Sequence, residues 1–157
     1  MIKVLFVCLG NICRSPLAQG VFEDLVKKKG LQDHFYADSA GVSGWHRGEP
    51  PHELSCRIAE KYSIDITKQR SRPVTTGDKF EFDYFIAMDQ SNRSSLIKEF
   101  GVDPEKLYCL REFDKTAGDM DVPDPYGSNL ASFDDVYKII SRSVEQFLNH
   151  LLKKIKL

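Results

Sequence analysis

An apolar run near the amino terminus, Ile2 to Val7 with Lys3 as its one charged residue, is the feature that most restricts how this chain can fold. The run is rich in β-branched residues and has no polar face, which is typical of a strand covered on both sides. Gly10 and Asn11 end it, and Ser15-Pro16 supplies a helix cap followed by a first-turn proline. A buried strand followed at once by a helix is the unit from which parallel sheets are built.

The same alternation continues along the chain. Apolar residues at helical spacing follow Pro16, and Gly30 ends that helix. Further strands are predicted at 36–39, 84–88 and 106–110, and further helices at 52–62, 92–100 and 132–152. No repeat, low-complexity tract or linker divides the 157 residues. The sequence therefore predicts one domain, residues 1–157, of the α/β class, with a parallel sheet and helices on both of its faces.

Charge and cysteine usage restrict the class of partner. The net charge is −1 with both signs interspersed, so we expect no nucleic-acid partner and no membrane surface. No signal peptide and no apolar run of membrane-spanning length is present, which favours a cytoplasmic protein. The cysteines are scattered and lack zinc spacing, so we expect a reducing compartment, no metal and no cofactor. They are Cys8, Cys13, Cys56 and Cys109.

The loop that follows the first strand carries the chemistry. In a parallel sheet, sites form at the carboxyl ends of strands, and Cys8 lies at such an end. Gly10 and Asn11 can take positive φ, so successive N–H groups can converge on an anion beside the helix start. Arg14 adds a planar fork that can hold two phosphate oxygens. The positive electrostatic field of the helix start and Arg14 also favours the thiolate form of Cys8. The arrangement predicts in-line attack on phosphorus and a covalent cysteinyl-phosphate.

A phosphoester also needs an acid that protonates the leaving oxygen. Asp124, in the stretch VPDPYG, is the candidate because Pro123 and Pro125 stiffen the backbone on either side of it. A nearby phosphate and thiolate would keep this carboxyl protonated more often. Asp119 and Asp121 are rivals that no proline holds in place, and a plain Asp-Pro turn is the structural alternative.

Four blocks, VCLGNICRSP, DSAGVSGW, DYFIAMDQSN and VPDPYG, occur in this order over nearly the whole chain, which resembles a low-molecular-weight protein tyrosine phosphatase. The resemblance implies a three-layer doubly wound fold with a four-stranded parallel sheet. It implies Cys8 as nucleophile, Arg14 as phosphate clamp and Asp124 as general acid. It also implies that Asn11, Ser15 and Ser39 form the hydrogen-bond network that fixes the loop, and that Asp89 is a further supporting carboxylate. The residues that it implies for substrate binding are Leu9, Gly10, Asn11, Ile12, Cys13 and Ser15 in the loop, with Trp45 and Tyr126 as cleft walls.

Three positions, Ile12, Gly127 and Gln69, bear on substrate preference or on the residues that support the loop. Relatives that act on phosphoarginine carry threonine where this chain has Ile12, which favours tyrosine-phosphorylated proteins, with inorganic phosphate as product and inhibitor. Gly127 follows Tyr126 where many relatives have a second aromatic residue, so we expect a more open cleft. A single aromatic residue followed by glycine also occurs in the family relatives that act on phosphoarginine. Gln69 stands where a histidine is common, so we expect any support from that histidine to be absent.

Other functions remain as alternatives. Cys13 either packs the loop or captures an oxidised Cys8 as a disulfide. An arsenate reductase of the same fold would need a later cysteine pair, whereas Cys56 and Cys109 lie far apart in the sequence. A phosphoprotein-binding module without turnover is disfavoured because Cys8, Arg14 and Asp124 are all present. A nucleotide-binding P-loop is excluded because no Gly-Lys-Ser/Thr sequence follows the glycine.

Overall fold

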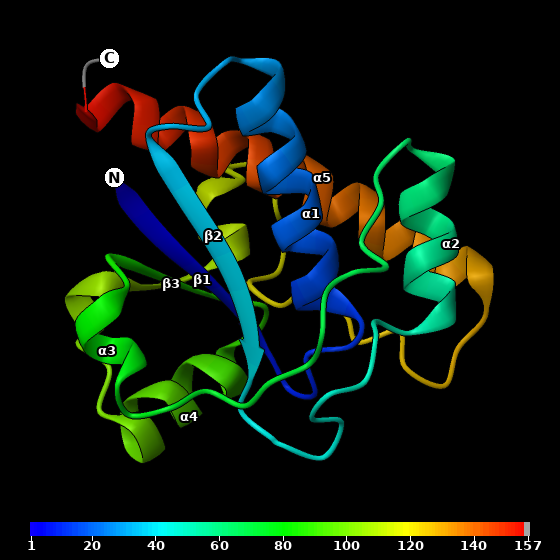
Figure 1. Ribbon diagram of the computed structural model, residues 1–157, viewed down its shortest axis with the longest axis horizontal. Coiled ribbons are helices and arrows are strands. Elements are labelled where there is room, and N and C mark those ends of the chain that lie inside the picture. Colours follow the sequence, from blue (N-terminus) through cyan, green and yellow to red (C-terminus); the bar gives the residue numbers. More distant parts are fainter. Residues whose placement is uncertain (156–157) are drawn as a thin grey trace.

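Four parallel strands form the centre of the computed structural model, which describes residues 1–155. They are β1 (Ile2–Cys8), β2 (Phe35–Gly41), β3 (Tyr84–Ala87) and β4 (Leu107–Cys109), in the spatial order β2, β1, β3, β4 (Figure 1). The chain runs from β1 to β2 on one side and then crosses back to β3 on the other. The strand order therefore reverses beside β1, and the crevice at such a switch point is where doubly wound folds bind ligands.

Helices cover both faces of the sheet. α1 (Arg14–Lys28), α2 (Glu53–Lys61) and α5 (Leu130–Ile155) lie on one side, and α3 (Asp78–Glu81) and α4 (Gln90–Phe100) on the other (Figure 1). The strand β1 feeds both layers, because Val4 and Phe6 belong to one buried cluster and Leu5 and Val7 to the other. An apolar strand without a polar face is thus explained by burial on both sides.

The larger core layer is held by aromatic side chains from three elements. Phe6 on β1, Phe22 on α1 and Phe147 on α5 are fully buried, with ring centroids 5.6 to 6.3 Å apart. Burying each such ring contributes about 1.5–3 kcal/mol. This packing fixes α1, and with it the loop that joins α1 to β1, against the sheet.

The predicted elements are confirmed, with their ends shifted by a few residues. α4 and α5 each begin two positions before the predicted start, and β2 extends from Phe35 to Gly41. α3 and the two 3-10 turns, η1 (Pro104–Lys106) and η2 (Leu110–Phe113), are too short for a periodic pattern to predict. One expectation was wrong: Ser15 does not cap α1. The helix begins at Arg14 after Cys13, and no side chain caps it. Across residues 1–155 no helix combines the length and the apolar character that crossing a membrane requires.

Candidate functional site

The loop from Cys8 to Arg14 lies at the carboxyl end of β1 and turns sharply into α1. Asn11 takes φ +57°, as predicted. Gly10 does not take a positive φ; it is needed for space instead, because a Cβ there would lie 3.0 Å from the His46 ring. Gly41 on β2 is constrained more strongly, since its Cβ would lie 2.8 Å from the carbonyl oxygen of Leu9. A close side-chain approach at Gly10 and a close backbone approach at Gly41 thus shape the loop.

Cys8 is buried beneath this loop, and two donors reach its sulfur. The Ser15 hydroxyl lies 3.0 Å from Sγ, and the backbone N–H of Asn11 donates to Sγ at 3.3 Å. The first turn of α1 begins at Arg14, so the positive end of the helix dipole lies beside the sulfur. Hydrogen bonds and the helix terminus both favour negative charge on the sulfur atom.

The loop presents N–H groups that could bind an anion. Within residues 1–155, five of its backbone N–H groups donate to no protein acceptor; they belong to Leu9, Gly10, Ile12, Cys13 and Arg14. The same five residues and Cys8 line one pocket of about 310 Å³. A loop of free N–H groups at a helix start is suited to a phosphate-sized anion.

Arg14 is almost completely buried and is held from one side. Its Nη1 donates to the Asp89 carboxylate and to the carbonyl oxygen of Val122, both at 2.8 Å. Neither Nε nor Nη2 has a hydrogen-bond acceptor in the described part of the chain, although Nη2 lies 3.8 Å from the Asp124 carboxylate. Burial alone would lower the pKa of Arg14, but the charges of Cys8, Asp89 and Asp124 outweigh it and raise that pKa. Arg14 therefore stays cationic, with its free nitrogens available to a ligand.

Asp124 lies at the pocket and is partly exposed. Its Oδ1 accepts the backbone N–H of Tyr126 at 3.1 Å. The two rival carboxylates lie elsewhere: Asp121 accepts the N–H of Gln90, Asp119 accepts that of Asp121, and neither lines the pocket. Asp124 is thus the carboxylate that shares a pocket with Cys8.

Three side chains form an apolar rim around the pocket. Trp45 is 91% exposed, Tyr126 59% and Leu9 52%. Large apolar side chains with this exposure at a pocket mouth indicate a surface that receives a flat apolar group. Ile12 lines the pocket as well, while its side chain is 7% exposed and offers no polar atom.

His46 and Ser43 also line the pocket and were not predicted from the sequence. The Nδ1 atom of His46 lies 3.0 Å from a carboxylate oxygen of Glu49, and its ring centroid lies 6.2 Å from that of Tyr126. The sequence offered one signal for His46: it directly follows Trp45, and a residue next to a predicted cleft wall is itself a candidate for lining the pocket.

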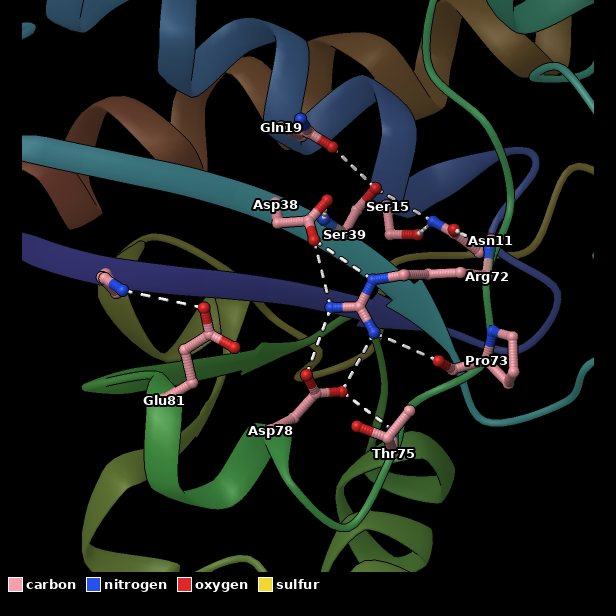
Figure 2. Close-up of polar contacts among 11 residues, drawn as sticks. Asn11, Ser15, Gln19, Asp38, Ser39, Arg72, Pro73, Thr75, Asp78 and Glu81 are labelled. Carbon is pink, nitrogen blue, oxygen red and sulfur yellow. Dashed lines mark hydrogen bonds and ion pairs between the residues drawn. The ribbon is translucent and has the colours of Figure 1, made fainter. Parts of the chain in front are cut away.

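Asn11, Ser15 and Ser39, together with Gln19, form a buried polar network behind the loop (Figure 2). The Nδ2 of Asn11 donates to the hydroxyl oxygens of Ser15 at 2.8 Å and Ser39 at 3.0 Å. Ser39 in turn donates to Oε1 of Gln19 at 2.7 Å. The side chains of Asn11 and Ser15 therefore lie outside the pocket lining, and support the loop from behind.

The remaining cysteines are placed differently from Cys8. Cys13 lines the pocket, and burial, with the negative charges of Cys8 and Asp124, raises its pKa to about 12. Cys56 lies on α2 and Cys109 on β4; neither lines the pocket. Gln69 supplies a link of its own, because its Nε2 donates to the carbonyl oxygen of Pro16 in the first turn of α1 at 3.1 Å.

Comparisons with known proteins agree on one family. The family model described as low molecular weight phosphotyrosine protein phosphatase matches residues 3–157. The chain is 42% identical to the low molecular weight protein-tyrosine-phosphatase YfkJ of Bacillus subtilis, over 100% of both chains. It is 37% identical to PtpA of Staphylococcus epidermidis, over 100% of this chain and 98% of PtpA.

Solved structures extend the comparison to the fold. The crystal structure of YfkJ superposes with a TM-score of 0.93 and covers 99% of this chain and 97% of that one. The structure of a Drosophila arginine phosphatase superposes with a TM-score of 0.87 at 34% identity, covering 96% and 98% of the two chains.

Proposed function

The chain belongs to the low molecular weight phosphotyrosine protein phosphatase family, and we propose that it hydrolyses phosphotyrosine in proteins through a cysteinyl-phosphate on Cys8. It is a phosphoric monoester hydrolase by family, and its substrates are phosphoproteins. One observation carries the mechanism: Cys8, Arg14 and Asp124 line the same pocket. We infer that residues 1–157 act as one domain in this reaction.

In the first step the Cys8 thiolate attacks phosphorus from below. The phosphate oxygens are held by the free N–H groups of the loop and by the free nitrogens of Arg14. The P–O bond to the tyrosine ring breaks, and Asp124 gives its proton to the departing phenolate oxygen. Asp89 and the carbonyl of Val122 hold the other side of Arg14, so its fork is oriented before the substrate arrives.

In the second step water attacks phosphorus and the P–S bond breaks. Asp124, now a carboxylate, accepts a proton from this water. The electron pair of the P–S bond returns to Cys8, where the hydroxyl of Ser15 and the N–H of Asn11 lie 3.0 and 3.3 Å from the sulfur. These two donors stabilise the thiolate as it leaves. Inorganic phosphate is the product and, because it fits the same anion site, a competitive inhibitor.

The pocket favours an aryl phosphate over phosphoarginine. Trp45 and Tyr126 offer apolar ring faces at its mouth, and Ile12 adds no hydrogen-bond partner for a guanidinium. An aromatic ring between such walls gains from burial against them. Phosphotyrosine is therefore the substrate that we assign.

Matched peptides test this assignment. A phosphotyrosine peptide and a phosphoarginine peptide of the same flanking sequence should differ in kcat/KM by at least about tenfold in favour of phosphotyrosine. Equal or reversed preference would assign the chain to arginine phosphatases. Arsenate reduction serves as a control, because Cys56 and Cys109 lie outside the pocket and cannot form a relay with Cys8 there. Turnover of either peptide also separates an enzyme from a silent phosphoprotein-binding module.

Two conditions complete the proposal. Hydrolysis should persist in EDTA and be inhibited by vanadate, and an absolute metal requirement would contradict the mechanism. We place the enzyme in the cytoplasm, because a thiolate nucleophile needs a reducing compartment to stay reduced.

A further inference from the structure

The segment from Gln69 to Val74 passes behind the phosphate loop and is bonded to it at several points. The hydroxyl of Ser71 donates to the carbonyl oxygen of Gly10 at 3.0 Å, and the backbone N–H of Arg72 donates to Oδ1 of Asn11 at 3.0 Å. The carbonyl oxygen of Arg72 accepts the N–H of Gly41 at 2.9 Å. This segment therefore supports the loop on the side away from the pocket.

The side chain of Arg72 holds the segment in place with all five of its N–H groups (Figure 2). Nε and Nη2 donate to Oδ2 of Asp38 at 3.1 and 3.0 Å. Nη1 and Nη2 donate to the two oxygens of Asp78 at 3.0 and 3.3 Å, and Nη1 also donates to the carbonyl oxygen of Pro73 at 3.1 Å. Burial would lower the pKa of Arg72, but Asp78 and Asp38 outweigh it and raise that pKa. No lysine could satisfy this fork of acceptors.

The backbone N–H of Arg72 sets the direction of the hydrogen bonds that lead to the nucleophile. An N–H can only donate, so the atom of Asn11 that faces Arg72 must be the carbonyl oxygen. The amide nitrogen of Asn11 then faces Ser15 and donates to its hydroxyl oxygen at 2.8 Å. That hydroxyl has one proton of its own, and the Cys8 sulfur lies 3.0 Å away to accept it.

We propose that Arg72 is a positioning residue, whose guanidinium fixes its own backbone N–H against Asn11 and thereby keeps the Ser15 proton directed at the Cys8 sulfur. The inference rests on the proposed function. If the backbone at Arg72 moves away, the Asn11 amide can turn over and present its oxygen to Ser15. Ser15 would then donate to Asn11, and the Cys8 sulfur would lose one of its two donors.

Two variants and one control test this role. Arg72→Gln removes the clamping guanidinium and Asp78→Asn removes the charge of one of its two carboxylate partners, whereas Arg70→Gln changes an exposed arginine whose hydrogen bonds within residues 1–155 go to the carbonyl oxygens of Thr67 and Gln69. The primary readout is the rate at which iodoacetate alkylates Cys8 at about pH 6, which follows the thiolate population. We expect both clamp variants to be alkylated about tenfold more slowly than the wild type, and Arg70→Gln to match the wild type.

Asp78→Asn separates positioning from simple electrostatics. The charged and titratable groups that face Cys8 in the pocket are Arg14, Asp124, Cys13 and His46, and no variant changes them. Removing the negative charge of Asp78 would favour a thiolate by Coulomb interaction alone, so faster alkylation of Asp78→Asn would overturn the proposal. Slower alkylation supports it, since only the displaced hydrogen-bond path gives that sign.

Kinetics and stability complete the test. In both clamp variants kcat for an aryl phosphate should fall about tenfold while KM stays within about twofold, because the anion donors are unchanged. If melting temperature falls while alkylation and kcat of the folded protein do not change, Arg72 is merely structural and the proposal is wrong. If Arg72→Gln does not fold, Arg72→Lys and Asp78→Asn give the same comparison. A wild-type protein without phosphatase activity contradicts the proposed function alone, since the alkylation rates do not depend on turnover.

Discussion

The hydroxyl oxygen of Ser15 lies 3.0 Å from the sulfur of Cys8, although the two residues are seven positions apart in the sequence. The distance is short because the loop between them folds back on itself at Asn11 and places the first turn of α1 beside the end of β1. A buried thiolate needs such donors, because burial alone would favour the neutral thiol. The contact therefore joins the shape of the loop to the chemistry of its nucleophile.

The pair formed by Asp89 and Arg14 should govern substrate binding. Asp89→Asn keeps the helix-capping oxygen of the side chain but removes the charge that holds Nη1 of Arg14 at 2.8 Å. A charge-assisted hydrogen bond of this kind is worth about 1.5–3 kcal/mol, so kcat/KM should fall about 10- to 100-fold in steady-state assays. Asp121→Asn is the matched control, because Asp121 accepts the N–H of Gln90 whereas the ion-pair partners of Arg14 among residues 1–155 are Asp89 and Asp124, and it should retain the wild-type value. Equal effects of the two changes would remove Asp89 from the site.

The role of Asp124 as acid should appear as a dependence on the leaving group. Asp124→Ala should slow hydrolysis of phenyl phosphates with poor leaving groups by about 10²- to 10⁴-fold and affect activated aryl phosphates far less. The pH profile of kcat/KM should lose its decline on the alkaline side, because the acid that must be protonated is gone. Asp119→Ala supplies the control. An unchanged pH profile in Asp124→Ala would show that another group is the acid.

Reactivity toward iodoacetate should distinguish the two cysteines of the loop. The pKa of Cys13 is raised to about 12 and that of Cys109 to about 11, in both cases mainly by burial. Below these pKa values each group is a thiol, so at neutral pH neither should react, and their labelling should begin only as the pH rises toward 11. Of the two loop cysteines, Cys8 should therefore carry the label in peptide mass spectrometry, with bound phosphate protecting it. Labelling of Cys13 before Cys8 at neutral pH would contradict this order.

The close approach of Gly41 to the loop should make this glycine costly to replace. A Cβ at Gly41 would lie 2.8 Å from the carbonyl oxygen of Leu9 and 2.9 Å from that of Ser43, both rigid backbone atoms. Gly41→Ala should lower the free energy of unfolding by about 1–3 kcal/mol and reduce turnover as the loop shifts. Gly118→Ala is the control, because nothing lies within 4 Å of a Cβ there. Denaturant titration should give a lower free energy of unfolding for Gly41→Ala than for Gly118→Ala. Equal values would show that the loop can shift to accommodate the added Cβ without cost.

Short-range sequence patterns were sufficient to predict most of the fold and the loop that holds the nucleophile. The apolar run of β1 and the helical spacing in α1 and α5 are short-range signals, so the strands and long helices could be predicted, along with the loop between Cys8 and Arg14. The positive φ of Asn11 was also within reach, because asparagine tolerates that conformation better than most residues.

The parts that could not be predicted depend on contacts between distant segments. Gly10 is explained by the position of His46, which a sequence pattern does not place. Arg72 reaches Asn11 across 61 positions, and nothing in its neighbourhood of the sequence marks it as a clamp. Ser15 is of a residue type that often caps helices, but α1 begins one residue earlier, at Arg14, so Ser15 lies inside the first turn and its hydroxyl is 3.0 Å from the Cys8 sulfur.

Trapping the phosphoenzyme tests the central claim most directly. The Ser15→Ala variant should slow the second step, because the leaving sulfur loses a donor 3.0 Å away, so the intermediate should accumulate. After rapid mixing with an aryl phosphate and acid quench, mass spectrometry should find one added phosphoryl group on the peptide that contains Cys8. The phenol released in the burst should equal the enzyme concentration. A steady turnover with no phosphorylated peptide, or a phosphoryl group on another residue, would contradict the account.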